Sequence, residues 1–168
     1  MAESDRQMHP AIAVVLSGIS ANDGRARVMG SVIREEDGAV AVVVHTDHRR
    51  YVIVVLREGD CWLEPGLVFS GVLPNPDRLE TNSPMMPLAQ QSGDIRSSLD
   101  GEFVWYAVVG TAALDAISVR VLTTLESRYP GIGDGGLVLE LVRAQRGERP
   151  LVTVTTRDGR EESDYREE

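Results

Sequence analysis

Three parts of the chain carry residue types that can do chemistry, and the first is the run His45-Thr46-Asp47-His48. Two imidazoles flank a carboxylate here, and His and Asp are common metal ligands. The same residues separate two valine-rich runs, however, and Asp with polar neighbours is typical of turns. A tight hairpin turn sends these side chains to different sides and gives a metal no supporting hydrogen bonds. We therefore interpret the run as a turn and assign no metal-binding residue.

The other two parts are Cys61 and the glycine-rich run 131–136. Cys61, next to Trp62, can act as a nucleophile only if a histidine and an acid reach it, and a free cysteine is more often a small buried hydrophobe. The glycine run can hold an anion through backbone N–H groups, but it lacks the following helix and the lysine of a phosphate loop. We interpret it as a hairpin connection. The sequence therefore predicts no catalytic residue, no cofactor-binding residue and no cofactor.

Four aromatic side chains can line a ligand groove or anchor a core. In a chain with only 5% aromatic residues, we interpret them as core anchors, because buried aromatics dominate protein cores. These residues are Trp62, Phe69, Trp105 and Tyr106.

Composition excludes several classes of function. The net charge is −9, and all 17 basic residues are arginine, so Schiff-base lysines, phosphate-loop lysines and Ser–Lys dyads are impossible. A chain this acidic is repelled by phosphate backbones, and we expect no nucleic acid partner. One cysteine cannot form an intramolecular disulfide. Apolar runs stay well below the ~18 residues of a membrane span, so we expect no membrane insertion and a cytoplasmic location.

The elements that must position any site are predominantly β. Residues 102–124 read as two strands, and the run 103–109 is apolar on both faces, which predicts a strand covered on both sides. A hairpin is predicted from 39–46 and 50–58 because a tight turn separates two valine-rich runs. Further strands are predicted at 61–70 (broken by Pro65-Gly66), 137–143 and 151–157. We therefore expect a mainly β fold, an antiparallel β-sandwich or open barrel of about seven short strands.

Two N-terminal segments can be either helix or strand. Residues 11–20 match a helical spacing and follow Pro10, although a short strand also fits. Residues 25–36 fit either type, with Met29, Val32 and Ile33 favouring a helix slightly. One or two helices here would cover a face of the sheet.

The domain organisation follows from composition. We expect a disordered N-terminus at 1–10, a single β-rich domain at 11–160 and an acidic tail at 161–168. Within the domain, residues 73–99 hold four prolines and no periodicity, which predicts a long surface loop.

The last third of the chain also resembles a known unit. The run GEFVWYAVVGTAALDAISVRV, a Gly-rich turn, LVLELV and then RPLVTVTTRDGRE are similar to a small β-sandwich unit common in actinobacterial proteins. The matching positions are Val109-Gly110, Asp115, Val119, Val121 and Asp158-Gly159. The resemblance covers about 60 residues, implies a fold, and brings no catalytic residue with it.

Two hypotheses for function follow. The first is a non-enzymatic β-sandwich interaction module that binds a protein partner or itself, because strands apolar on both faces need cover and the chain shows no catalytic constellation. The alternative is a small-molecule-binding protein or enzyme with the 73–99 segment as a lid. An exposed apolar patch would favour the first hypothesis, and a pocket with converging polar groups would favour the second.

Overall fold

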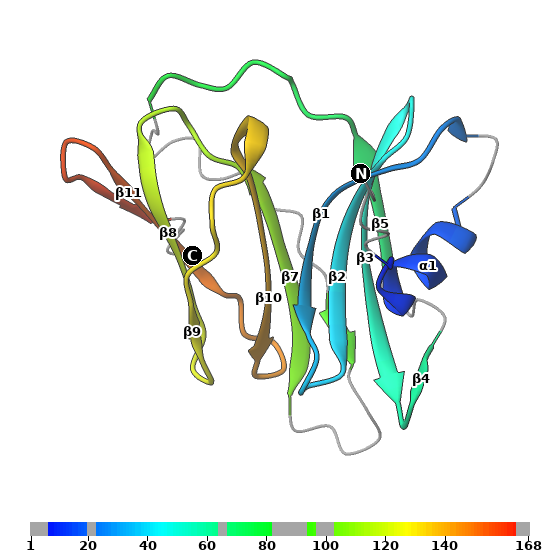
Figure 1. Ribbon diagram of the computed structural model, residues 1–168. Helices are drawn as coiled ribbons and strands as arrows, with labels where there is room; N and C mark the ends of the chain where they lie inside the picture. Colours follow the sequence, from blue (N-terminus) through cyan, green and yellow to red (C-terminus); the bar gives the residue numbers. More distant parts are fainter. Residues whose placement is uncertain (1–6, 20–22, 64–66, 82–93, 97–102, 164–168) are drawn as a thin grey trace, which may run out of the picture.

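Three antiparallel sheets lie face to face in the computed structural model of the chain, with a short helix outside them (Figure 1). The structure describes residues 7–19, 23–63, 67–81, 94–96 and 103–163. In Figure 1 the layers follow one another from right to left: helix α1, the first sheet, the middle sheet and the third sheet. The predicted mainly β, antiparallel fold is confirmed. No helix in the described part is long and apolar enough to cross a bilayer.

The first sheet is built around a valine-rich hairpin. Its central strands bury side chains on both faces, and tight turns with left-handed glycines, such as Gly38 at φ +62°, reverse the chain between strands. The strand order is β1-β2-β3, and both β4 and β5 pair with β3. The strands are β1 (Arg27–Arg34), β2 (Ala39–His45), β3 (Arg49–Glu58), β4 (Cys61–Trp62) and β5 (Leu67–Val72).

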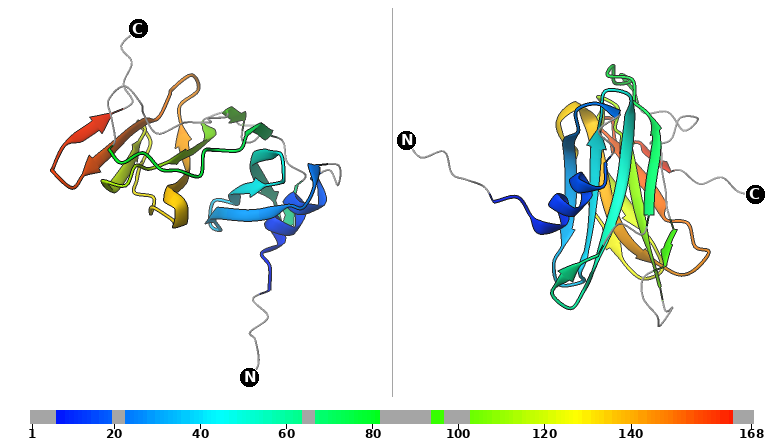
Figure 2. Two further views of the ribbon diagram at one scale, coloured as in Figure 1. Left: turned by 90° about the horizontal axis from the view of Figure 1, so that it is seen from above. Right: turned by 90° about the vertical axis from the view of Figure 1, so that its right-hand side faces the viewer.

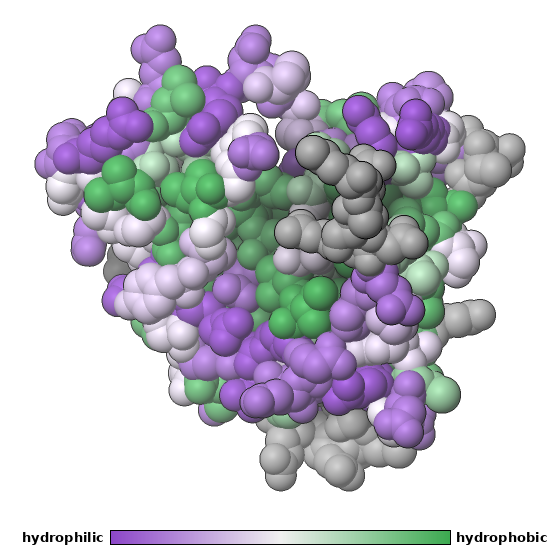
Figure 3. Space-filling view, in the orientation of Figure 1, coloured by the Kyte–Doolittle hydropathy of each residue, from purple (hydrophilic) through white to green (hydrophobic). Residues whose placement is uncertain are grey.

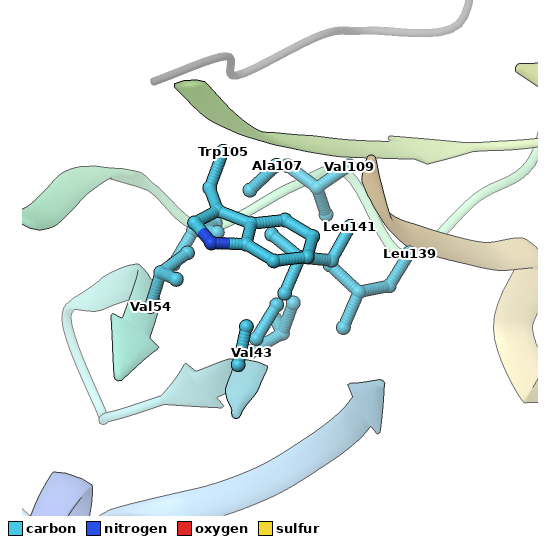
Figure 4. Close-up of a cluster of buried hydrophobic side chains, with 10 residues drawn as sticks. Val43, Val54, Trp105, Ala107, Val109, Leu139 and Leu141 are labelled. Carbon is cyan, nitrogen blue, oxygen red and sulfur yellow. The ribbon is translucent and has the colours of Figure 1, made fainter. Parts of the chain in front are cut away.

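The middle sheet holds the strand that the sequence places at the centre. Its order is β10-β7-β6, where β6 is Asp94–Arg96, β7 is Val104–Thr111 and β10 is Leu137–Ala144. Odd-numbered side chains of β7 and β10 pack against the first sheet, and Figure 4 shows Trp105 among them, reaching toward Val54 and Val43. Even-numbered side chains such as Val108 pack against the third sheet. The prediction that β7 is covered on both sides is therefore confirmed.

The third sheet closes the stack on the other side. Its order is β12-β11-β8-β9, and its inward side chains include Val119, Val121, Val152 and Val154. Ile117, which alternation assigns to the same face, is 57% exposed because the register shifts by one residue next to it. The strands are β8 (Ala116–Leu122), β9 (Ser127–Arg128), β11 (Leu151–Thr156) and β12 (Glu161–Ser163).

Helix α1 (Pro10–Ser17) covers the outer face of the first sheet, as the right-hand view of Figure 2 shows. Its N-terminus is capped by His9, whose ring Nδ1 accepts the N–H of Ala11 at 3.2 Å. Ala11 and Val15 are buried against the outward valines of β2 and β3. The helical interpretation of residues 11–20 is therefore confirmed for 10–17.

Several boundaries differ from the sequence prediction. Residues 25–36, where a helix is slightly favoured, form strand β1 instead, because pairing with β2 satisfies its backbone. The run 131–136 is not a hairpin connection: it ends in the 3₁₀ turn η2 (Asp134–Gly136) and joins β9 to β10, which lie in different sheets. Part of the predicted 73–99 loop forms β6, and part of the predicted acidic tail forms β12. Residues 1–6, 82–93, 97–99 and 164–168 lie outside the described part.

Candidate functional site

The run 45–48 forms the turn between β2 and β3, and it does not assemble its side chains into one site. The ring Nε2 of His45 accepts a hydrogen bond from Arg50 Nε at 2.8 Å. Burial lowers the pKa of His45, and the charges of Arg50 and Arg27 lower it further. Asp47 instead accepts the N–H of Arg25 at 3.3 Å, and His48 is exposed. In the described part of the chain no three metal-ligating side chains gather.

Cys61 lies far from both histidines. It is exposed and pairs with Glu58 at one end of β3, whereas His45 pairs with Arg50 at the other end. Eight residues of extended chain separate those ends, roughly 26 Å at ~3.3 Å per residue. The structure therefore does not bring Cys61 and His45 together.

The Arg78 side chain occupies the space beside the glycine-rich run 131–136. Arg78 donates from Nε to the carbonyl of Ala112 at 2.9 Å and from Nη2 to that of Ala113 at 3.0 Å. Gly136, at φ +83°, has no room for a side chain, since a Cβ there would lie 2.5 Å from Arg78 Nε. The guanidinium therefore occupies the space beside η2. Of the four aromatics, Trp105 is a buried core anchor, while Trp62, Phe69 and Tyr106 are only half-buried.

A buried ion pair joins the first sheet to the other two. Arg34, at the end of β1, reaches Glu126 in the turn between β8 and β9 through both Nη atoms, and its Nη2 also pairs with Asp37 at 2.9 Å. The Arg34 and Glu126 side chains are only 7% and 10% exposed. The Arg34 guanidinium lies over the Trp105 ring at 4.9 Å from its centroid. This pair therefore closes one end of the core between the first and middle sheets.

Local turn chemistry places the Glu126 carboxylate. Thr123 is buried, and its hydroxyl accepts the N–H groups of Leu125 and Glu126 and donates to the carbonyl of Arg143 at 2.6 Å. Burial raises the pKa of Glu126, but the hydrogen bonds from Arg34 and from the Arg143 N–H, with the charges of both arginines, outweigh it and bring the pKa below its usual value. The carboxylate is therefore held ionised.

These contacts also cover the outer edge of β10. The carbonyl of Leu141 accepts from Arg34 at 3.0 Å, and its N–H donates to Glu140. The N–H of Arg143 donates to Glu126 at 2.6 Å, and its carbonyl accepts from Thr123. Side chains thus occupy outward backbone groups that would otherwise pair with another strand.

The outer edge of β1 is different. Hydrogen bonds at both ends of the β2–β3 hairpin, Thr46 N–H to Arg49 O and Arg57 N–H to Gly38 O, show that even-numbered residues of β2 bond to β3. Odd-numbered residues of β2 therefore bond to β1, and the register leaves the N–H and C=O of Ser31 and Ile33 pointing outward. In the described part, no strand and no side chain pairs with them.

Apolar side chains accompany this open edge. Val28, Met29 and Ile33 are 39%, 45% and 43% exposed, and Figure 3 shows apolar surface along the seam where β1 and β10 lie side by side. Gly30 lies close to β10, because a Cβ there would lie 3.0 Å from Leu137 Cδ2. The edge of β1 therefore combines outward backbone groups with exposed apolar side chains.

Comparisons with protein-family models, with curated proteins and with solved structures return no match. The resemblance of the last third to an actinobacterial unit therefore stays a prediction.

The sequence predicted neither the open edge of β1 nor the ion pair between Arg34 and Glu126. The edge of β1 was missed because Met29, Val32 and Ile33 also fit a helix. Arg34 and Glu126 are 92 residues apart, and the only signal near them is the Thr123 turn.

Proposed function

We propose that this chain is a non-enzymatic interaction module that binds another protein molecule through the outer edge of β1, and that a second copy of the chain is the partner. The observation that carries the proposal is the contrast between the two neighbouring edges. Side chains cap the edge of β10, whereas the outward groups of Ser31 and Ile33 have no partner among the described residues and are flanked by exposed apolar side chains. An open edge of this kind is a template for an added strand.

The sequence of β1 suits pairing with itself. Antiparallel pairing of two copies about a two-fold axis at Val32 sets Ser31 of one copy opposite Ile33 of the other, so that the outward N–H and C=O groups of both residues find partners. The irregularity between Val28 and Gly30 limits the pairing to the segment that follows it. The interface is therefore short, and we expect a dimer that dissociates on dilution.

The test is the solution mass by light scattering on a size-exclusion column over a range of concentrations. We expect the mass to rise toward twice the 18.3 kDa of one chain. Ser31→Pro removes an outward N–H and should weaken the dimer roughly tenfold or more, whereas Ser31→Ala keeps that N–H and should not. Ile33→Lys should also weaken it, with Ile117→Lys as a matched control, because Ile117 is exposed on the third sheet.

Two outcomes would overturn the proposal. A monomer at every concentration excludes a second copy as the partner. A dimer whose dissociation constant is unchanged by both Ser31→Pro and Ile33→Lys places the interface elsewhere. Circular dichroism checks that each variant is folded.

A further inference from the structure

An arginine lies at each end of the core between the first and middle sheets, and the two arginines differ in whether a carboxylate pairs with them. At one end Arg34 is paired with Glu126 and Asp37. At the other end Arg50 is only 8% exposed, and no carboxylate of the described residues lies within ion-pair distance of it. Its one hydrogen bond is from Nε to His45. The four N–H groups on its Nη atoms have no protein partner in that part of the chain.

An unpaired buried arginine is costly, because burial removes the water that stabilises its charge. Burial accordingly lowers the pKa of Arg50. A chain with 26 acidic residues has ample means of supplying a partner, as it does for Arg34. The missing partner therefore points to an anion that comes from outside the chain.

The neighbours of Arg50 are also suited to an anion. Arg27, His45 and Arg50 lie opposite one another on three adjacent strands, on the face that looks toward the middle sheet. Because His45 Nε2 accepts from Arg50, the proton of the neutral ring is on Nδ1, which can only donate. Arg27 is exposed at the edge strand and adds a second guanidinium. These three side chains therefore offer N–H donors and positive charge.

We propose that Arg50, His45 and Arg27 form a binding site for a doubly charged oxyanion of the phosphate class, with Arg50 at its base. The two Nη atoms of Arg50 bind two oxygens of the anion, and Arg27 neutralises its second charge. His45 holds the guanidinium in place through Nε. This site lies on the inward face of the first sheet and is independent of the proposed self-association of β1.

The experiment measures inorganic phosphate binding to the full chain by titration calorimetry and by the rise in Tm, at constant ionic strength set with chloride. We expect saturable binding to the wild type and to Arg146→Met, a control that removes an exposed arginine. Arg50→Lys keeps the charge but loses the two-pronged contact and should bind roughly tenfold more weakly, and Arg50→Met should lose saturable binding. The general stabilisation that phosphate gives any protein is common to all variants and cancels in the comparison.

A second measurement separates this site from a structural arginine. Without phosphate, Arg50→Met should be at least as stable as the wild type, because it removes an unpaired buried charge. Absence of saturable phosphate binding to the wild type overturns the proposal, and a clear loss of stability in Arg50→Met without phosphate overturns the description of Arg50 as an unpaired buried charge. Binding of acetate as tight as that of phosphate overturns the assignment to a doubly charged anion. Undiminished phosphate binding by Arg50→Met overturns the assignment to Arg50.

Discussion

Replacing Glu126 by Gln should destabilise the fold far more than any substitution of an exposed carboxylate. The change keeps the size of the side chain but leaves the buried Arg34 without its main counter-charge, since the two groups are 7% and 10% exposed. Breaking a buried pair by removing one partner costs about 3–5 kcal/mol. Asp37 remains beside Arg34, so we expect the lower end, about 3 kcal/mol.

The assay is reversible urea or thermal unfolding followed by circular dichroism. For a chain of this length, about 3 kcal/mol corresponds to a fall in Tm of roughly 6–12 °C. Glu36→Gln is the matched control, because Glu36 is exposed and should change stability by less than about 0.5 kcal/mol. In a double-mutant cycle with Arg34→Met, the two changes should couple by about 2 kcal/mol, because the second removes a charge that the first has left unpaired.

The pH dependence gives an independent check. The folded pKa of Glu126 is lowered, so the ionised carboxylate contributes stability that is fully present above its unfolded pKa and is lost as pH falls through the folded value. The difference in stability between wild type and Glu126→Gln should therefore shrink in acid. A variant as stable as wild type at neutral pH, or a difference that acid leaves unchanged, would refute the role assigned to this ion pair.

Two further predictions concern the same core. Arg50 and Arg27 face His45, and the folded pKa of His45 lies below 6.5, so the wild type should lose stability as pH falls below 6.5 toward that folded value. His45→Gln should abolish this loss, whereas the control His48→Gln should retain it. Urea unfolding between pH 5 and 8 measures the difference. Trp105→Ala should cost about 3–5 kcal/mol in the same assay because the ring is 2% exposed, whereas Trp62→Ala, at a half-buried position, should cost clearly less.

The turns and the doubly apolar strands could be predicted because their signals are local. Valine-rich runs such as 39–44 cannot leave either face in water, and Gly38 permits a φ that other residues adopt only with strain. The position of Ile117 could not be predicted, because a register shift against β11 changes its face. The candidate site at β1 could not be predicted either, because the spacing of its apolar residues fits both a helix and a strand.

The sequence by itself determined which segments must be buried on both sides, where the chain reverses, and which chemistries the lack of lysine excludes. Only the tertiary structure decided how the strands divide among three sheets, so that β7 and β8, consecutive in the chain, lie in different layers. It also decided that Arg34 meets Glu126 while Arg50 meets no carboxylate of the described residues. The physical reason is that burial demands cover but does not specify which surface supplies it, and pairing between distant residues depends on the register of strands that lie between them.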